Sequence, residues 1–367
     1  MPDALDLTIL DPGVAGAPHV LALARRGSDV AIAEIPCDRT LTDLLATRDR
    51  LEAVSKGEAP ALDAAAVKSF GVQLRDYVFR GDLAKLLGRA DSGRRVRVQL
   101  LATREEFHRL PWEYMQFDPL GDPGPDNTRL IVRLPSAFVG KTPPAPLRLE
   151  EGAKLRILFV AADPTDEQVV HWARWAPRMR DKLDQALGAG NFHIRVIAAS
   201  SLTDVQRALA AEPCDVFQFA GHGAVDSQDE GVLLFRSPEN SKGVPVKASV
   251  LAESLKGRGI RLAVLSACRS SAGGFRAQFR STAVSLLDAG IGAVVANQFS
   301  VPQAAVDSFL DGLYGSLLAH GDIDVAVAEG RLRMRGAIAG DLGHFAWGIP
   351  TLYRLYEGAM LLERRAG

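Results

Sequence analysis

The sequence predicts an α/β protein built on a mostly parallel sheet that helices cover on both faces. In the second half, short runs rich in Val, Phe, Leu and Ala alternate with segments whose apolar residues recur at helical spacing. Strands that alternate with helices form βαβ crossovers, which produce parallel sheets buried on both faces. The chain has 367 residues, of which 47% are hydrophobic, so it can bury a large core and form two subdomains.

The first 150 residues predict an α/β subdomain without a reactive constellation. The predicted elements are strands over 5–12 and 28–36, helices over 40–57 and 62–90, and strands over 94–102 and 128–135. The first two strands are expected to form an antiparallel pair at a sheet edge, with a turn-rich segment between them. The stretch over 62–90 is long enough for one or two helices, and a threonine is suited to the N-cap of the helix over 40–57.

A segment rich in proline, glycine and charge, Val139 to Lys154, predicts the boundary between subdomains 1–150 and 151–367. Beyond it the alternation of strands and helices becomes regular. The predicted strands are 154–163, 192–199, 214–222, 261–268, 292–299 and 349–356, and the predicted helices are 172–189, 203–210, 246–257, 281–290, 303–318 and 322–335.

The overall charge and the cysteine content exclude several classes of protein. The 43 basic and 44 acidic residues leave a net charge of −1, so no global field favours nucleic acid or an anionic membrane. Cys37, Cys214 and Cys268 are too few for a disulfide framework or a metal cluster, and no cofactor is expected. The first residues lack a signal pattern and no apolar run approaches about 20 residues, which favours a cytoplasmic protein.

Two of the predicted strands end at side chains capable of nucleophilic chemistry. CDVFQFAGHG delivers His222 between two glycines, and IRLAVLSACRS delivers Cys268. The carboxyl ends of parallel strands meet at one edge of a sheet, where catalytic groups gather. An imidazole beside a thiol lowers the pKa of the thiol and can carry a proton to a leaving amine. We therefore expect Cys268 as nucleophile, His222 as general base and acid, and the N–H groups of Gly223 and Cys268 as oxyanion donors.

The residues around this pair resemble the signatures of caspase-like cysteine peptidases. SACRS shares its central Ala-Cys-Arg with the caspase signature, and His222 lies roughly 50 residues upstream of Cys268. A longer ordered series is similar to the CHAT domain, a bacterial branch of clan CD related to separase and caspases. The series is LPWEYM (110–115), FAGHG (219–223), LSACRSS (265–271), LLDAGIGAVVANQFSVP (286–302) and FAWGIPTLYRL (345–355).

The resemblance implies a caspase-like fold over roughly residues 95–355 and, for the amino-terminal subdomain, a degenerate caspase-like fold as one alternative. It also implies a cysteine endopeptidase that cleaves a partner protein in a bacterial stress or antiviral defence pathway. A second protein partner is expected to activate the enzyme. No direct contact with nucleic acid or a membrane is expected. Two other interpretations stay open: a CHAT-fold interaction module whose thiol is silent, and a module that senses a small ligand in the same cleft.

The resemblance further implies that specificity depends on the residue before the scissile bond. Relatives often carry a W-x-V-x-D pattern, whose acid binds arginine in arginine-selective members; here Phe299 replaces the Trp and Gln303 the Asp. Because an unpaired buried arginine is costly, we expect an uncharged or apolar residue before the scissile bond. The candidate substrate-binding residues are Gln303, Asp226 and Arg269, and the alternative acids for a basic residue are Asp226, Asp229 and Glu230.

Other conspicuous side chains are predicted to be structural. No third catalytic residue is evident, and the loop over 269–280 is expected to flex without substrate or activator. The residues expected to pack or to bridge the two halves are Trp112, Glu113, Phe345 and Trp347, and those expected to be inert thiols are Cys37 and Cys214.

Overall fold

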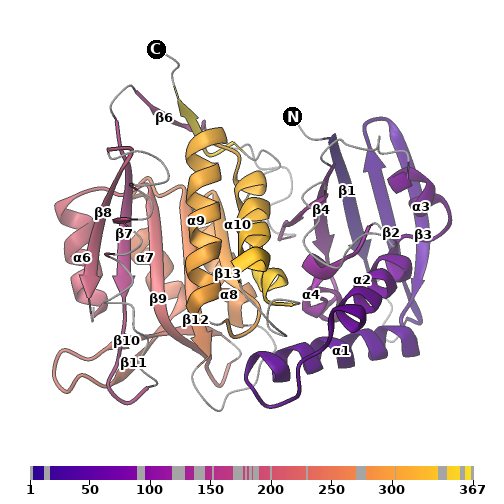
Figure 1. Ribbon diagram of the computed structural model, residues 1–367, viewed down its shortest axis with the longest axis horizontal. Coiled ribbons are helices and arrows are strands. Elements are labelled where there is room, and N and C mark those ends of the chain that lie inside the picture. Colours follow the sequence, from indigo (N-terminus) through magenta and orange to yellow (C-terminus); the bar gives the residue numbers. More distant parts are fainter. Residues whose placement is uncertain are drawn as a thin grey trace.

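One continuous sheet forms the centre of the molecule, with helices on both of its faces (Figure 1). The computed structural model describes residues 3–11, 17–88, 96–117, 129–135, 145–150, 153–167, 177, 180–181, 184, 190–198, 201–228, 230–269, 278–301, 303–337, 345–355 and 360–364. At residues 3, 96, 129, 224–225, 267–269, 278–280, 303–304, 337 and 364 the description covers the backbone alone. Within these residues, no helix combines the length and the apolar character that crossing a bilayer requires.

The central sheet is mixed: two groups of parallel strands meet at the antiparallel pair β13–β14, and further antiparallel strands lie toward the ends of the sheet. Its path runs β11 (Gly243–Lys247), β10 (Gly231–Arg236), β9 (Val216–Val225), β12 (Leu262–Arg269), β13 (Ala293–Asn297), β14 (Pro350–Arg354), β5 (Arg129–Arg133), β4 (Val96–Ala102), β1 (Asp3–Leu10), β2 (His19–Arg26) and β3 (Asp29–Pro36). Off this path, β7 (Leu155–Ala161) pairs with β8 (Phe192–Ala198) and with β9. The strands β8, β7, β9, β12 and β13 are mutually parallel, and so are β14, β5, β4 and β1, which confirms the predicted fold class.

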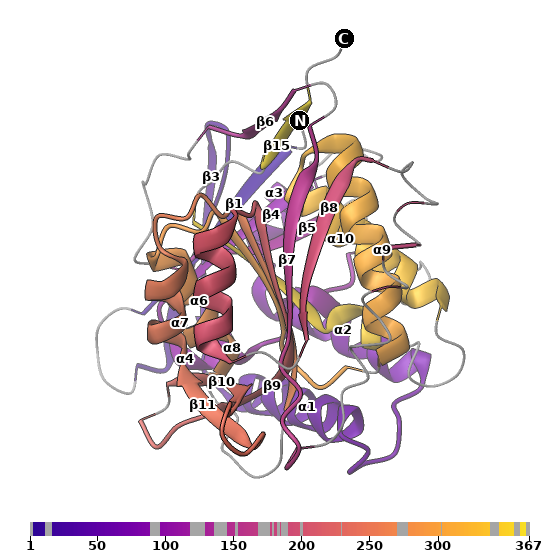
Figure 2. The ribbon, with the colours of Figure 1, turned by 90° about the vertical axis from the view of Figure 1, so that its left-hand side faces the viewer.

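Two layers of helices enclose the sheet in the second half of the chain (Figure 2). The helices there are α6 (Leu202–Ala211), α7 (Ala248–Leu255) and α8 (Gln278–Asp288) on one face, and α9 (Gln303–His320) and α10 (Ile323–Ala337) on the other. Earlier in the chain lie α1 (Arg39–Ser55), α2 (Ala64–Val78), α3 (Gly81–Gly88), α4 (Glu105–Arg109) and the 3-10 turn η1 (Trp112–Tyr114), and later the turn η4 (Ala346–Gly348). Outside the main sheet, β6 (Leu147–Leu149) pairs with β15 (Leu362–Arg364). A Cβ added at Gly312 of α9 would lie 2.7 Å from the Cα of Gly330 in α10, so glycines allow these two helices to touch.

Residues of β9 and β12 alternate between two cores, as expected for strands that are buried on both faces. The core shared with α9 and α10 contains Val216, Ala220, Leu262 and Val264, and the core shared with α6, α7 and α8 contains Phe217, Phe219, Ala263 and Leu265. The Tyr314 hydroxyl of α9 donates a hydrogen bond of 2.6 Å to the Gln218 side chain of β9. Even-numbered positions of both strands therefore face α9 and α10.

The described part of the amino-terminal region contains strands that were not predicted, and one of them changes the expected pairing of the first two predicted strands. The segment expected to be a turn-rich connection holds β2, which pairs antiparallel with both β1 and β3. Its inward residues, Val20, Ala22 and Ala24, are fully buried, but alanine rarely favours strands and this weakened the signal. The predicted threonine N-cap of α1 is also wrong, because the Asp38 carboxylate accepts the Thr40 amide at 2.8 Å and caps the helix.

The prediction that the histidine strand ends at His222 is wrong. β9 continues to Val225, because residues 222–225 pair antiparallel with β10, a strand that was not predicted. Before Gly221, the same edge of β9 pairs with β7, up to Ala161 opposite Ala220. β9 thus changes partner at Gly221, where an added Cβ would lie 2.8 Å from the Ala162 carbonyl oxygen.

The helix predicted over 246–257 begins later, at Ala248, because residues up to Lys247 belong to β11. The run β10 to β11 is an antiparallel pair of apolar strands, from Val232 opposite Lys247 to Arg236 opposite Gly243. Most of the helix predicted over 172–189 lies outside the described residues, as do residues 270–277 of the loop predicted to flex.

The sheet continues without a break between the two halves of the chain, through the pairing of Tyr353 in β14 with Arg133 in β5. Glu113 of η1 is joined to Arg133 and to Gln298, and Trp112, Phe345 and Trp347 are buried, which confirms their predicted packing and bridging roles. The division of the chain into subdomains 1–150 and 151–367 stays a prediction.

Candidate active site

His222 and Cys268 occupy directly paired positions on neighbouring parallel strands. In the register of β9 with β12, Ser266 lies opposite Ala220 and Cys268 opposite His222. Neighbouring strands run about 4.8 Å apart. Both residues lie toward the carboxyl ends of their strands, and His222 occupies an even-numbered position of β9, on the face that α9 covers. The side chain of His222 is buried, with 3% exposure, whereas that of Cys268 is outside the described part of the chain.

A third strand ends beside this pair. β7 runs parallel to β9 up to Ala161, and Asp163 follows two residues later, half-buried. Three adjacent parallel strands therefore carry Asp163, His222 and Cys268 near or just beyond their carboxyl ends. The sequence analysis did not single out Asp163, although an acid directly after the apolar run LRILFVAA was a usable signal.

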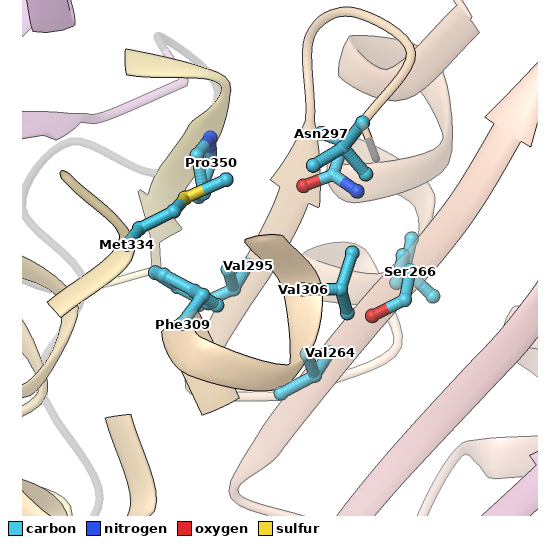
Figure 3. A pocket seen from close by; sticks show the side chains of 10 residues that line it. Val264, Ser266, Val295, Asn297, Val306, Phe309, Met334 and Pro350 are labelled. Carbon is cyan, nitrogen blue, oxygen red and sulfur yellow. The ribbon is translucent and has the colours of Figure 1, made fainter. Parts of the chain in front are cut away.

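A pocket opens on the α9 face of the sheet, beside Ser266, which precedes Cys268 by two residues in β12 (Figure 3). Its empty volume is about 240 Å³, including the part open to solvent. The lining residues are Val264, Leu265, Ser266, Val295, Asn297, Val301, Val306, Phe309, Met334 and Pro350. Ser266 and Asn297 supply the polar groups, and the remaining lining side chains are apolar. None of these described lining residues carries a charge.

Gly223 lies inside β9, with Leu233 of β10 on one side and Arg269 of β12 on the other. This position lies beyond the end of the strand predicted over 214–222, because the hairpin with β10 extends the ladder past His222. The role of its N–H as an oxyanion donor stays a prediction. The same holds for Arg269 and Gln303, which end β12 and begin α9, with side chains outside the described residues.

Asp226 anchors the turn between β9 and β10. Its carboxylate accepts the Gln228 amide at 2.8 Å and the Glu230 amide at 2.9 Å. These backbone hydrogen bonds, with Lys247 at 3.1 Å, hold the pKa of Asp226 below its ordinary value. Lys247 also binds Glu230 at 2.9 Å. Both acids already have a cationic partner, so neither offers an open counter-ion for a basic substrate; Asp229 lies outside the described residues.

The two other cysteines lack the properties of a nucleophile. Cys214 is 2% exposed, and burial raises its pKa to about 11. It precedes β9 and so lies at the opposite end of the strand from His222. Burial also raises the pKa of Cys37, whose sulfur accepts a hydrogen bond from Arg104. A raised pKa leaves less thiolate at neutral pH, which fits the structural role predicted for both residues.

An α/β sheet with histidine and cysteine at paired positions near the ends of two parallel strands is typical of caspase-like proteins. The sequence model of the CHAT domain matches residues 69–347, and the chain therefore belongs to the CHAT domain family. The predicted resemblance is confirmed. A search of curated proteins finds no match.

One of the solved structures that align with the chain supports the same fold. The Saccharomyces cerevisiae separase–securin complex aligns with a TM-score of 0.52 and 11% identity over 99% of this chain and 30% of that one. The chain thus spans about a third of the length of that relative, and at this identity the likeness concerns the fold alone. A secreted C11 cysteine protease from Bacteroides thetaiotaomicron, bound to an irreversible peptide inhibitor, aligns with a TM-score of 0.32 and 11% identity over 48% of this chain and 57% of that one.

Proposed function

We propose that the protein is a cysteine endopeptidase that cleaves a partner protein. The observation that carries the proposal is the direct pairing of His222 with Cys268 in the β9–β12 register. The sulfur of Cys268 attacks the carbonyl carbon while His222 takes the thiol proton, which it then gives to the departing amine as the C–N bond breaks. Water hydrolyses the resulting thioester. The N–H groups of Gly223 and Cys268 stabilise the oxyanion.

The proposed enzyme prefers an uncharged or apolar residue before the scissile bond, held in the pocket beside Ser266. The apolar lining by Val301, Phe309 and Met334 supports this preference, and Ser266 and Asn297 can bind backbone or small polar groups. A basic side chain there would lose its hydration without gaining a counter-ion. If Arg or Lys is nevertheless preferred, Asp163, which follows the strand next to β9, is a candidate acid, and Asp163→Asn tests it.

The proposed setting is a bacterial stress or antiviral defence pathway in the cytoplasm, in which cleavage of a partner protein triggers a response. A second protein partner is proposed to control the activity, as the family resemblance suggests; the structural relative was solved as a complex with securin. Direct contact with nucleic acid or a membrane is not part of this proposal.

Peptide acyloxymethyl ketones test the proposal, because they alkylate an activated thiol that can bind the peptide. We expect labelling at Cys268 and not at Cys37 or Cys214, as located by mass spectrometry. Cys268→Ala should abolish labelling, and His222→Ala should slow it by about 10²-fold or more, since general base catalysis contributes that much. Absence of labelling, or equal labelling of all three thiols, contradicts a peptidase and favours the silent interaction module or the small-ligand module.

A further inference from the structure

We propose that the amino-terminal half of the chain sets the wall of this pocket by holding the segment from Asn297 to Val301, which links β13 to α9. The inference rests on the proposed function, because it concerns the pocket assigned to the residue before the scissile bond. Asn297 and Val301 line the pocket and are 6% and 7% exposed. Gln298 and Phe299, between them, contact the amino-terminal half.

Gln298 is held by Glu113 of η1. Its side-chain amide donates to the Glu113 carboxylate at 3.0 Å and to the Gly348 carbonyl at 2.7 Å, and its backbone N–H donates to the Ile349 carbonyl at 3.0 Å. The Glu113 side chain is completely buried, and Arg133 binds it through Nε at 3.0 Å and Nη2 at 2.6 Å. A buried carboxylate held this tightly fixes the position of its other partner, Gln298.

The network of Glu113 also reaches Pro350, a second lining residue of the pocket. Arg331 of α10 approaches the Glu113 carboxylate at 4.0 Å, and its guanidinium donates to the Pro350 carbonyl at 2.7 and 3.1 Å. Pro350 lines the pocket. Glu113 is therefore connected to Asn297 through Gln298, and to Pro350 through Arg331.

Phe299 is held by Arg48 of α1. The guanidinium carbon of Arg48 lies 5.2 Å from the centre of the Phe299 ring, and the ring is 1% exposed. Glu52 and Asp49 bind the same guanidinium, so the cation is oriented from its own helix. A desolvated cation over an aromatic ring is attracted more strongly than an exposed one. The link makes the position of α1 a determinant of the pocket wall.

Arg48 and Glu113 are thus positioning residues that act on the pocket through Phe299 and Gln298. A protein that binds the amino-terminal half and displaces α1 or η1 would change the shape of the pocket without touching the thiol. This is a physical route by which the proposed activating partner could control cleavage.

The test compares Arg48→Met and Glu113→Gln with a matched control, Arg104→Met. Arg104 is a half-buried arginine of the same half that binds Ala17 and Cys37, far in sequence from the segment 297–301. The first measurement is the rate of Cys268 labelling by peptide acyloxymethyl ketones with Leu, Phe, Ala or Arg before the ketone. The second is hydrogen exchange of the amides over 294–301.

We expect Arg48→Met and Glu113→Gln to change the ratio of the Leu and Phe rates by about threefold to tenfold, while iodoacetamide labels Cys268 at an unchanged rate. Exchange over 294–301 should rise in both variants and not in Arg104→Met. Phe299→Leu should change the ratio by itself, and Arg48→Met should add little in that background because the two act through one contact. Arg48→Lys, which keeps the charge, should restore part of the ratio.

Equal slowing of all probes, or unchanged exchange over 294–301 in both variants, overturns the inference. If the wild-type protein reacts with none of the probes, the proposed function fails, and the exchange comparison still decides whether the amino-terminal half holds the segment. If Glu113→Gln does not fold, the inference is tested with the three other variants alone: Arg48→Met, Arg48→Lys and Phe299→Leu.

Discussion

Two buried charge networks join the halves of the chain, and they differ in what they hold. One is centred on Asp324 at the start of α10, whose carboxylate binds Arg97 of β4 and Arg354 of β14. Asp322 completes it, by binding Arg97 at 3.1 Å and accepting the amides of Asp324 and Val325. The other is centred on Glu113 and ends at Gln298 and Pro350, beside the pocket.

Under the proposed function, the same chemistry serves stability alone in the Asp324 network and stability together with specificity in the Glu113 network. In both networks a completely buried carboxylate lies between two arginines that come from distant segments. The Asp324 network fixes the start of α10 to two strands, and none of its named members lines the pocket. The Glu113 network, in contrast, binds the carbonyl of the lining residue Pro350 and the side chain of Gln298, which neighbours the lining residue Asn297. Substitutions in the Asp324 network and in the Glu113 network should therefore lower the free energy of unfolding by similar amounts. Only those in the Glu113 network should change the selectivity for the residue before the scissile bond.

The largest expected effect is the loss of stability on Asp324→Ala. This variant leaves the buried guanidinium groups of Arg97 and Arg354 with one carboxylate fewer, and breaking such a pair costs about 3–5 kcal/mol. Urea unfolding measures the loss, and the selectivity ratio of the folded variant should stay as in the wild type. The control is Asp43→Ala, which breaks an exposed pair with Arg39 and should cost less than about 1 kcal/mol. A large change in selectivity for Asp324→Ala would abolish the distinction between the networks.

A matched pair of glycines gives the next largest effect. A Cβ at Gly348 would lie 2.4 Å from the Tyr114 ring, next to the Glu113 network, and one at Gly321 would lie 1.9 Å from the Leu362 carbonyl, next to Asp322. Gly321 also has a φ of +71°, which side chains disfavour. Both alanine variants should lose about 1–3 kcal/mol of stability through overpacking. Only Gly348→Ala should alter selectivity, since Gly348 accepts the Gln298 amide; equal profiles for the two variants would contradict this.

The pairing of His222 with Cys268 could be predicted from the sequence, because it depends on two short apolar runs that end at chemically capable residues. The bridging role of Glu113 could also be predicted from its motif. Its partner Gln298 could not, because the two are 185 positions apart and neither residue type specifies the other. The contact of Arg48 with Phe299 was missed for the same reason.

The length of the histidine strand was mispredicted because glycines usually end strands, whereas here Gly221 and Gly223 lie between partner strands. The apolar run of β10 supplied the partner that extends β9, and local propensity does not report such pairing. Asp226 was named as an alternative substrate acid from its place after the histidine. In the structure the Asp226 carboxylate binds two backbone amides and Lys247, so its role is to stabilise the turn after β9.

The partly exposed cluster of Asp226, Glu230 and Lys247 at the turn after β9 gives the smallest expected effect. Hydrogen bonds and Lys247 lower the pKa values of both Asp226 and Glu230, so their contribution to stability is fully present above about pH 4, the ordinary carboxyl pKa. It is lost as the pH falls through the lower pKa values of the folded state. Lys247→Met should therefore lower the melting temperature slightly at pH 7 and not at pH 2.5, whereas Lys256→Met, at another exposed pair, should change little at either pH. If Lys247→Met lost as much stability at pH 7 as Asp324→Ala, solvent would not be screening the charges of this cluster. The expected difference between this cluster and the two buried networks would then be wrong.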